Sequence, residues 1–234
     1  MISILSTKTL SASERNLFTD RGFFLEIAPM IQVLPTLSSD ELLPLIREGV
    51  PETCVFTSKS AAEIYVKAVE GLSDFSPGKI CALAPATSEI IENAGFNVFI
   101  KGDSAADLAE KIIQAGDIRS VHFFCGNKRM QVLPSQLKEA GIIVKETLVY
   151  ETIKTPRPLE FLNFDAVLFF SPAAVESFFS KNHLPVHTAI FSIGKTTEKT
   201  IKAYTSCPVF FPPTPSLSLL PDMIEAYLTN SNLR

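Results

Sequence analysis

The sequence holds few of the side chains that most often build metal centres and nucleophilic active sites. Its 234 residues include four cysteines and three histidines, and no two cysteines form a C-x-x-C pair. The histidines, at positions 122, 183 and 187, do not have the spacing of metal ligands. We therefore expect no metal centre, and we interpret the cysteines as buried free thiols in a reducing compartment.

Strong charge and long apolar runs are also missing. The formal net charge is -4, which gives no overall signal for a nucleic-acid partner. No segment approaches the ~20 apolar residues that span a bilayer, and the first run, MISIL, is too short for the core of a signal peptide. We expect a cytoplasmic protein that binds neither nucleic acid nor a membrane.

Several motifs of common enzymes are absent as well. The chain contains no G-x-G-x-x-G for a dinucleotide, no complete P-loop and no G-x-S-x-G of a serine hydrolase. Gly194-Lys195-Thr196 resembles the end of a P-loop, but Ala189 stands where that loop needs its first glycine. These absences exclude three frequent active-site designs.

What the sequence does contain is a regular alternation of short apolar runs and longer amphipathic segments. Candidate strands cover residues 2–5, 23–27, 54–56, 80–84, 97–100, 121–124, 142–150, 166–170, 188–193 and 209–211. Strands that alternate with helices are typical of parallel sheets covered on both faces, so the predicted class is α/β. Glycines at 22, 95 and 141 mark helix ends, and helix starts are expected at a capping box over 60–63 and at Ser171-Pro172.

Two long-range similarities indicate that this pattern is duplicated. Residues 56–62 resemble residues 169–175, and residues 84–89 resemble residues 194–198. Ser58 and Thr87 in the first series are separated by nearly the same stretch as Ser171 and Thr197 in the second. Two series with the same order and similar spacing predict two related domains.

Two proline-bearing segments, residues 34–39 and 152–158, are interpreted as linkers. The most economical arrangement inserts one domain, residues 37–152, into another made of residues 1–33 and 159–234. Two linkers that cross together form a hinge, which suits an active site in a closing cleft between the domains.

In parallel sheets ligands bind beyond the carboxyl ends of the strands, so the residues that come after the predicted strands are the site candidates. These residues are rich in hydroxyls and cations, and helix starts add free N–H groups that hold anions, so the pattern predicts a polyanionic small molecule as ligand. For each residue alone a helix cap or a solvated lysine is the simpler interpretation, and only the repetition favours a site. The candidate binding residues are Thr7, Lys8, Thr57, Ser58, Lys59, Pro85, Ala86, Gly126, Lys128, Arg129, Ser171, Gly194, Lys195 and Thr196.

Five short segments succeed one another in the order of a known family pattern. F-T-S-x-x-A-V corresponds to residues 56–62, V-G-x-x-T-A-E to 83–89, and G-x-x-V-x-x-x-x-V-Y-x-T to 141–152. F-x-S-P-x-A-V corresponds to residues 169–175, and I-G-x-T-T to 193–197. In this order and spacing the segments resemble the uroporphyrinogen-III synthase family of haem biosynthesis over nearly the whole chain.

The resemblance implies two flavodoxin-like domains joined by a two-stranded linker, which agrees with the inserted-domain arrangement. It also implies a lyase without metal or cofactor that cyclises hydroxymethylbilane, a linear tetrapyrrole with eight carboxylates. The terminal hydroxyl is lost, ring D is inverted, and uroporphyrinogen III results. We expect the enzyme to be a monomer whose only partner is this small-molecule substrate.

Tyr150 is the first candidate for catalysis, because it ends the strand that enters the second linker. Its phenol could protonate the departing hydroxyl, whereas the simpler interpretation is that it packs the hinge. Thr87 and Thr197, at equivalent places in the two domains, are the next candidates. The chain departs from the family pattern at Lys8, where arginine is usual, and at Ala84, where glycine is usual.

Two other function classes stay open from the residues. One is a binding protein that closes on a small anion without chemistry, and the other is a degenerate synthase that acts as a regulatory module. The presence of Tyr150, Thr87 and Thr197 together favours the enzyme.

Overall fold

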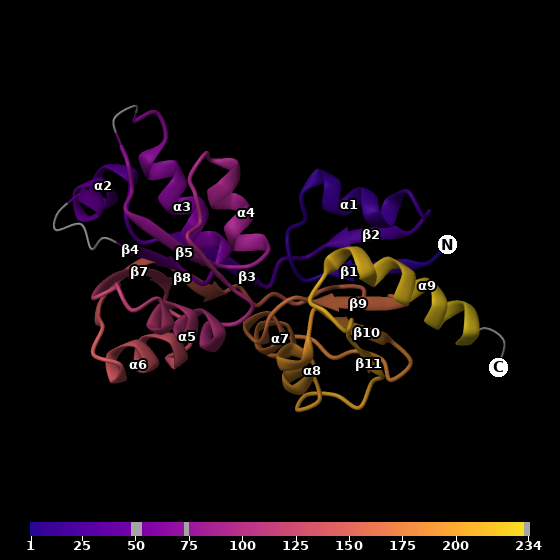
Figure 1. Ribbon diagram of the computed structural model, residues 1–234. Coiled ribbons are helices and arrows are strands. Elements are labelled where there is room, and N and C mark those ends of the chain that lie inside the picture. Colours follow the sequence, from indigo (N-terminus) through magenta and orange to yellow (C-terminus); the bar gives the residue numbers. More distant parts are fainter. Residues whose placement is uncertain (48–52, 73–74, 232–234) are drawn as a thin grey trace. The chain divides into compact units, whose positions relative to one another are not determined.

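The computed structural model describes residues 1–47, 53–72 and 75–231. The chain folds into two compact units (Figure 1). Unit 1 comprises Met1–Gln32 and Ile153–Arg234, and unit 2 comprises Val33–Thr152. Each unit holds its own sheet and its own buried clusters of apolar side chains.

Unit 1 is built on a parallel sheet with the strand order β11-β10-β9-β1-β2. Helices α7 (Pro172–Phe179) and α8 (Lys195–Ile201) pack on one face through Phe178 and Ile201. Helices α1 (Ala12–Thr19) and α9 (Leu220–Ser231) pack on the other through Phe18 and Ile224, and the short 3₁₀ helix η1 (Leu217–Leu219) precedes α9. The strands are β1 (Ser3–Ser6), β2 (Phe24–Ile27), β9 (Ala166–Phe169), β10 (Ala189–Ser192) and β11 (Val209–Phe210).

Unit 2 is built on a second sheet with the order β3-β8-β7-β4-β5-β6, in which β4 to β8 pair in parallel. Three helices cover one face, namely α2 (Ser39–Arg47), α3 (Lys59–Val69) and α4 (Ala86–Asn93), and α5 (Ala105–Ala115) and α6 (Val132–Glu139) cover the other (Figure 1). The strands are β3 (Ile31–Pro35), β4 (Thr53–Phe56), β5 (Lys79–Leu83), β6 (Ile100–Gly102), β7 (Ser120–Gly126) and β8 (Ile143–Lys154).

The predicted class of two parallel α/β sheets is confirmed. The central strands β4 and β9 are buried at every residue, as expected for parallel strands with helices on both faces. Gly22, Gly95 and Gly141 have positive φ angles of 75°, 87° and 80°, so the predicted left-handed helix ends are confirmed. In the described residues no helix is long and apolar enough to cross a bilayer.

Two local predictions are corrected. The strand predicted at 97–100 lies at Ile100–Gly102, because Phe96 still donates its N–H to the carbonyl of Ile91 in the preceding helix. The helix start predicted at Ser60 lies two residues earlier, since Ser58 is the N-cap and accepts the N–H of Ala61. The segments predicted as linkers contain two strand ends: 34–39 includes the end of β3, and 152–158 includes the end of β8.

The two units share one strand order. In unit 1 the sequence β2-β1-β9-β10-β11 runs across the sheet, and in unit 2 the sequence β8-β7-β4-β5-β6 does the same. Strand β4 therefore corresponds to β9, β5 to β10, and β7 to β1. The correspondence places Ser58 at the same point as Ser171 and Thr87 at the same point as Thr197, which agrees with the duplication inferred from the sequence.

Candidate active site

The carboxyl ends of the unit 2 strands frame a cavity. Because β4 to β8 are parallel, the loops after β4, β5, β6 and β7 all leave the sheet at one edge. The cavity at this edge has a volume of about 270 Å³. It is lined by Thr57, Ser58, Leu83, Ala105, Lys128, Arg129, Met130, Leu133 and Tyr150. Five residues singled out from the sequence thus share one hollow, and four apolar ones complete it.

The two hydroxyls of this cavity differ in what they contact. Ser58 Oγ accepts the N–H of Ala61 at 3.2 Å, so it caps α3 and keeps its own proton to donate. Thr57 is half-buried, and its hydroxyl makes no hydrogen bond to any described residue. Thr57 is therefore the freer donor, and Ser58 serves both as cap and as cavity wall.

The two cations of the cavity are not equivalent. Arg129 Nε donates to Glu146 at 2.5 Å, and Lys138 Nζ lies 3.2 Å from the other carboxylate oxygen. Burial alone raises the pKa of Glu146, but the hydrogen bonds from Arg129 and Lys138 outweigh it, and the pKa is lowered. Arg129 is thus already paired with a carboxylate, which it shares with Lys138. Lys128 is exposed and has no ion pair within the described part of the chain, so it is the cation available to an anionic ligand.

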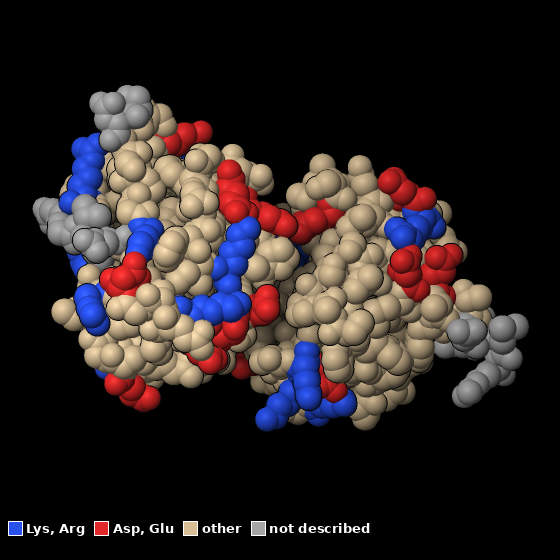
Figure 2. Space-filling view, in the orientation of Figure 1, with Lys and Arg blue, Asp and Glu red and all other residues tan. Residues whose placement is uncertain are grey.

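Charged side chains of both signs are mixed over the visible face of unit 2 (Figure 2). On the face drawn in Figure 2, lysines and arginines alternate with carboxylates rather than forming one positive field. The ion pairs Lys101–Glu92 and Lys111–Asp107 are two such contacts, with N···O distances of 2.7 Å and 2.8 Å. Attraction of an anion therefore has to come from local groups, not from the overall field.

Tyr150 reaches the cavity through a break in the register of β8. Residues Cys125 and Leu148 are paired, but the next pair is Gly126 with Tyr150, so β8 carries one extra residue at this point. A bulge of this kind re-aims the side chain that comes after it. The Tyr150 ring is half-buried against the cluster around Phe56 and Phe124, and its hydroxyl makes no hydrogen bond to a described residue.

The other predicted residues of unit 2 lie at the start of α4 or beside Ser58. Thr87 is buried, with 5% of its surface exposed, and it is the second residue of α4. Ala86 is half-buried and Pro85 is exposed, and no side chain caps this helix. Lys59 is exposed at the start of α3. None of these four lines the cavity, and their roles stay predictions.

In unit 1 most candidates lie near helix starts, where their roles stay predictions, and one is corrected. Ser171 Oγ accepts the N–H of Ala174 at 3.2 Å and caps α7, with Pro172 at the first helical position as predicted. Thr197 is buried near the start of α8, after Gly194 and two exposed residues. The exposed pair is Lys195 and Thr196. These residues stand at the strand ends where the sequence placed them.

Thr7 is the correction. Its side chain is fully buried, and its hydroxyl donates to the carbonyl of Leu168 at 2.7 Å, so it ties β1 to β9 and is not available to a ligand. Lys8 is engaged as well, because its Nζ lies 3.5 Å from a carboxylate oxygen of Glu14 and 5.5 Å from the ring centroid of Phe170. A position after a strand therefore does not by itself leave a side chain available to a ligand.

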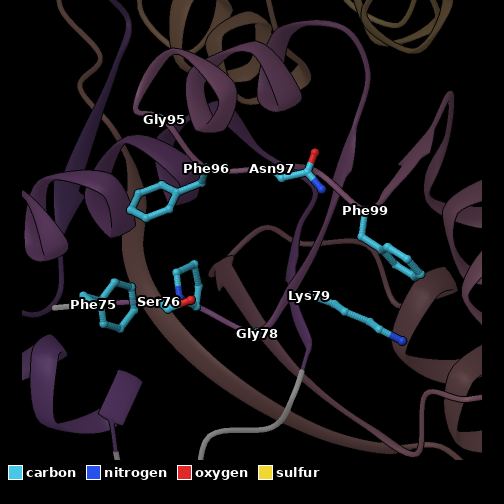
Figure 3. Close-up of a pocket in the computed structure, with 9 residues that line it drawn as sticks. Phe75, Ser76, Gly78, Lys79, Gly95, Phe96, Asn97 and Phe99 are labelled. Carbon is cyan, nitrogen blue, oxygen red and sulfur yellow. The ribbon is translucent and has the colours of Figure 1, made fainter.

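A larger hollow of about 450 Å³ opens near the amino end of β5 (Figure 3). Its walls include the rings of Phe75, Phe96 and Phe99, and Lys79 stands at its rim. The ammonium of Lys79 already contacts Asp117 and lies 4.6 Å from the Phe99 ring centroid. Because this hollow lies at the amino end of β5 and its cation has a partner, size alone does not make it the active site.

Sequence reasoning missed several residues of the strand-end cavity. Leu83, Ala105, Met130 and Leu133 form its apolar part, and no pattern in the sequence separates them from ordinary core residues. The counter-ion Glu146 was also missed, since no local pattern links it to Arg129. Among the described residues, no group of three His, Cys, Asp or Glu side chains is placed to hold a metal ion.

Taken together, the fold and the cavity define a class: an α/β protein of two related parallel-sheet units with an anion-suited cavity at the strand carboxyl ends of one unit. Within that class, the family model described as uroporphyrinogen-III synthase HemD matches residues 13–220. The chain therefore belongs to the uroporphyrinogen-III synthase family. The predicted family, and with it the predicted enzyme class of a cyclising lyase, is confirmed.

Solved structures show the same fold at low sequence identity. A uroporphyrinogen III synthase of the extremely thermophilic bacterium Thermus thermophilus, in a mutant form, has a TM-score of 0.68 and 15% identity, with 98% of this chain and 100% of that chain covered. The uroporphyrinogen-III synthetase of Helicobacter pylori has a TM-score of 0.65 and 20% identity, with both chains covered in full at 100%. No curated protein matches the sequence significantly.

Proposed function

We propose that the protein converts hydroxymethylbilane into uroporphyrinogen III. The terminal C–O bond breaks with help from the pyrrole nitrogen, and the hydroxyl leaves as water after gaining a proton. The terminal carbon then bonds to the ring D carbon that carries the methylene from ring C, and the bond between that carbon and the methylene breaks. The methylene bonds to the free α carbon of ring D, which loses its proton, so ring D is inverted and the macrocycle is closed. The observation that carries the proposal, beside the family membership, is the strand-end cavity with Tyr150, Lys128 and Thr57 on its wall.

Each of these residues has a role that its chemistry allows. The phenol of Tyr150 donates a hydrogen bond or a proton to the departing hydroxyl. Lys128, which has no ion pair among the described residues, and the hydroxyl of Thr57 bind substrate carboxylates. The apolar wall of Leu83 and Leu133 suits pyrrole rings, since a ligand with charged arms and flat apolar rings needs both surfaces.

Catalysis in this proposal is spread over many groups. The substrate carries its own leaving group, and its pyrrole nitrogen supplies the electrons that expel it. The protein mainly has to hold a productive conformer, and such ordering supplies several kcal/mol. Backbone N–H groups at helix starts share in that holding. We further propose a cytoplasmic, monomeric enzyme that uses no cofactor, as the sequence led us to expect.

The activity test uses chelator-treated protein and freshly generated hydroxymethylbilane, with the ratio of product isomers measured by chromatography. The III isomer should exceed the I isomer, which forms without an enzyme. Product of the I type alone would reject the proposal. Tight binding of product without turnover would instead identify an anion-binding or regulatory module.

A second arm addresses Tyr150. Tyr150→Phe should lower kcat/KM by about 10²-fold or less, the lower end of a general-acid contribution. Tyr204→Phe is the matched control, because Tyr204 lies on unit 1 and stacks on Phe179 with ring centroids 5.3 Å apart. A well-folded Tyr150→Phe protein with no detectable turnover would make Tyr150 an essential acid and contradict the proposal that catalysis is spread over many groups.

A further inference from the structure

The position of the Tyr150 ring depends on the absence of a side chain at Gly126. A Cβ atom built on Gly126 would lie 2.3 Å from Cζ and 2.7 Å from the hydroxyl oxygen of Tyr150. Real Cβ atoms do not approach other heavy atoms so closely, so the ring occupies the space that a side chain at 126 would need. The register break that pairs Gly126 with Tyr150 therefore brings the ring directly over the end of β7.

The next residue, Asn127, is hydrogen-bonded to β8 at Tyr150 and beyond it. The backbone N–H of Asn127 donates to the Tyr150 carbonyl at 3.2 Å. The side-chain Oδ1 of Asn127 accepts the N–H of Thr152 at 2.9 Å. One residue thus makes two hydrogen bonds to β8, at Tyr150 itself and two residues beyond it, where the ordinary pairing with β7 has ended.

We infer that Asn127 is a positioning residue for Tyr150, a role that rests on the proposed function of that tyrosine. Asn127 is exposed and does not line the cavity, so it acts through β8 and not on the substrate. Its backbone N–H holds the carbonyl of Tyr150 in place, and its carboxamide oxygen holds the N–H of Thr152 in the next part of the strand. Gly126 leaves the space into which this arrangement directs the ring.

The side-chain bond is the part that mutation can remove. Asn127→Leu keeps the approximate size but deletes the acceptor for the Thr152 N–H. Asn127→Asp puts a carboxylate oxygen in place of the amide oxygen and should retain the bond. We expect Asn127→Leu to lower kcat/KM by about tenfold, since small displacements of an active-site group are costly, with kcat changing more than KM. Asn127→Asp should stay within about twofold of the natural protein.

A double-mutant cycle separates positioning from a general structural role. If Asn127 acts through the Tyr150 hydroxyl, then Asn127→Leu should cost about twofold or less when it is added to Tyr150→Phe, because the group it positions is already gone. An equal loss in both backgrounds would show that Asn127 supports the fold and would overturn the inference.

A spectroscopic readout keeps the inference testable without turnover. The chain has four tyrosines and no tryptophan, so ¹³Cζ-tyrosine labelling gives few signals, and Tyr150→Phe assigns one of them. Asn127→Leu should shift or broaden the Tyr150 signal, and Asn127→Asp should restore it. An unmoved signal in Asn127→Leu would overturn the inference. If the natural protein makes no III isomer, the proposed function fails, whereas this signal still decides the positioning of the ring.

Discussion

The carboxyl end of β1 in unit 1 and that of β7 in unit 2 occupy equivalent places but differ in structure. In unit 1 the chain leaves β1 at Thr7, whose hydroxyl donates to the Leu168 carbonyl. The backbone N–H of Met30 donates to the Thr7 carbonyl at 3.1 Å, and the Met30 side chain is fully buried. In unit 2, β7 and β8 take the places of β1 and β2, but they run farther, to the bulge at Gly126 and Tyr150. The end of β1 is buried and hydrogen-bonded, whereas the end of β7 lies beside a tyrosine that lines a cavity.

The two units differ in the residues that surround a shared pattern. Both have a capping serine after the central strand and a buried threonine after its neighbour, at Ser58 and Thr87 and again at Ser171 and Thr197. The two serines cap α3 and α7, and so stabilise the same helix start in both copies. Chemistry, in the proposed function, depends on the features that are not shared, above all the glycine and the bulge that admit Tyr150.

The largest expected effect comes from adding a side chain at Gly126 in unit 2. Gly126→Ala places a Cβ 2.3 Å from Cζ of Tyr150, so the ring has to move away. We expect kcat/KM to fall by about 10²-fold, the full contribution assigned to the tyrosine. The free energy of unfolding should fall by about 1–3 kcal/mol, as for other overpacked sites. Kinetics and denaturant titration measure the two effects.

The control for this prediction removes the ring. In a Tyr150→Ala background the nearest obstacles to the new Cβ are gone, so Gly126→Ala should then cost much less stability. A cost that is the same in both backgrounds would mean that residue 126 is restricted by something other than Tyr150.

The second expected effect concerns acid. His122 lies in β7, at the level where β1 of unit 1 has the apolar Leu5, and it is 1% exposed. Its Nε2 lies 2.6 Å from Thr147 Oγ1, and its ring stacks on Phe124 with centroids 4.1 Å apart. Burial, with a smaller contribution from the charge of Lys145, lowers the pKa of His122 from 6.5 to about 4.

A lowered histidine pKa makes the folded state lose stability in acid. Above pH 6.5 the histidine is neutral in both states, and as the pH falls toward 4 only the unfolded state gains a proton. The free energy of unfolding should therefore drop by about 2 kcal/mol from this residue between pH 8 and pH 5. His122→Gln should remove that part of the pH dependence, and His187→Gln, at an exposed site of unit 1, should not. Equal pH profiles for the natural protein and His122→Gln would contradict the assignment.

The smallest expected effects come from the residues that the units share. Thr87→Ala and Thr197→Ala should each cost about 1 kcal/mol of transition-state stabilisation, the value of one neutral hydrogen bond, or about fivefold in kcat/KM. Thr200→Ala on α8 is the control, since Thr200 Oγ1 donates to the carbonyl of Thr196 in its own helix. Equal losses would mean that both units contact the substrate, and a loss confined to Thr87 would restrict the chemistry to unit 2.

Much of the fold could be predicted from local patterns in the sequence. Apolar runs such as Ala166–Phe169, glycines such as Gly141 and the Ser171-Pro172 helix start depend on residues close together in the chain, so their signals survive without tertiary context. The strand β3 was missed because it is largely exposed and ends in Pro35, which does not look like a strand. Family membership was also predictable from the sequence, through the order of five short segments.

The tertiary structure decided which strand-end residues are available to a ligand. The sequence placed Thr7, Thr57 and Lys128 in one class, since all three come after strands. Only the folded chain shows that the Thr7 hydroxyl is used by Leu168 while Lys128 lines a cavity. It likewise decided that Arg129 is paired with Glu146 and that Gly126 makes room for Tyr150. These outcomes depend on distances between residues far apart in the chain, and a pattern of residue types along the sequence carries no such distances.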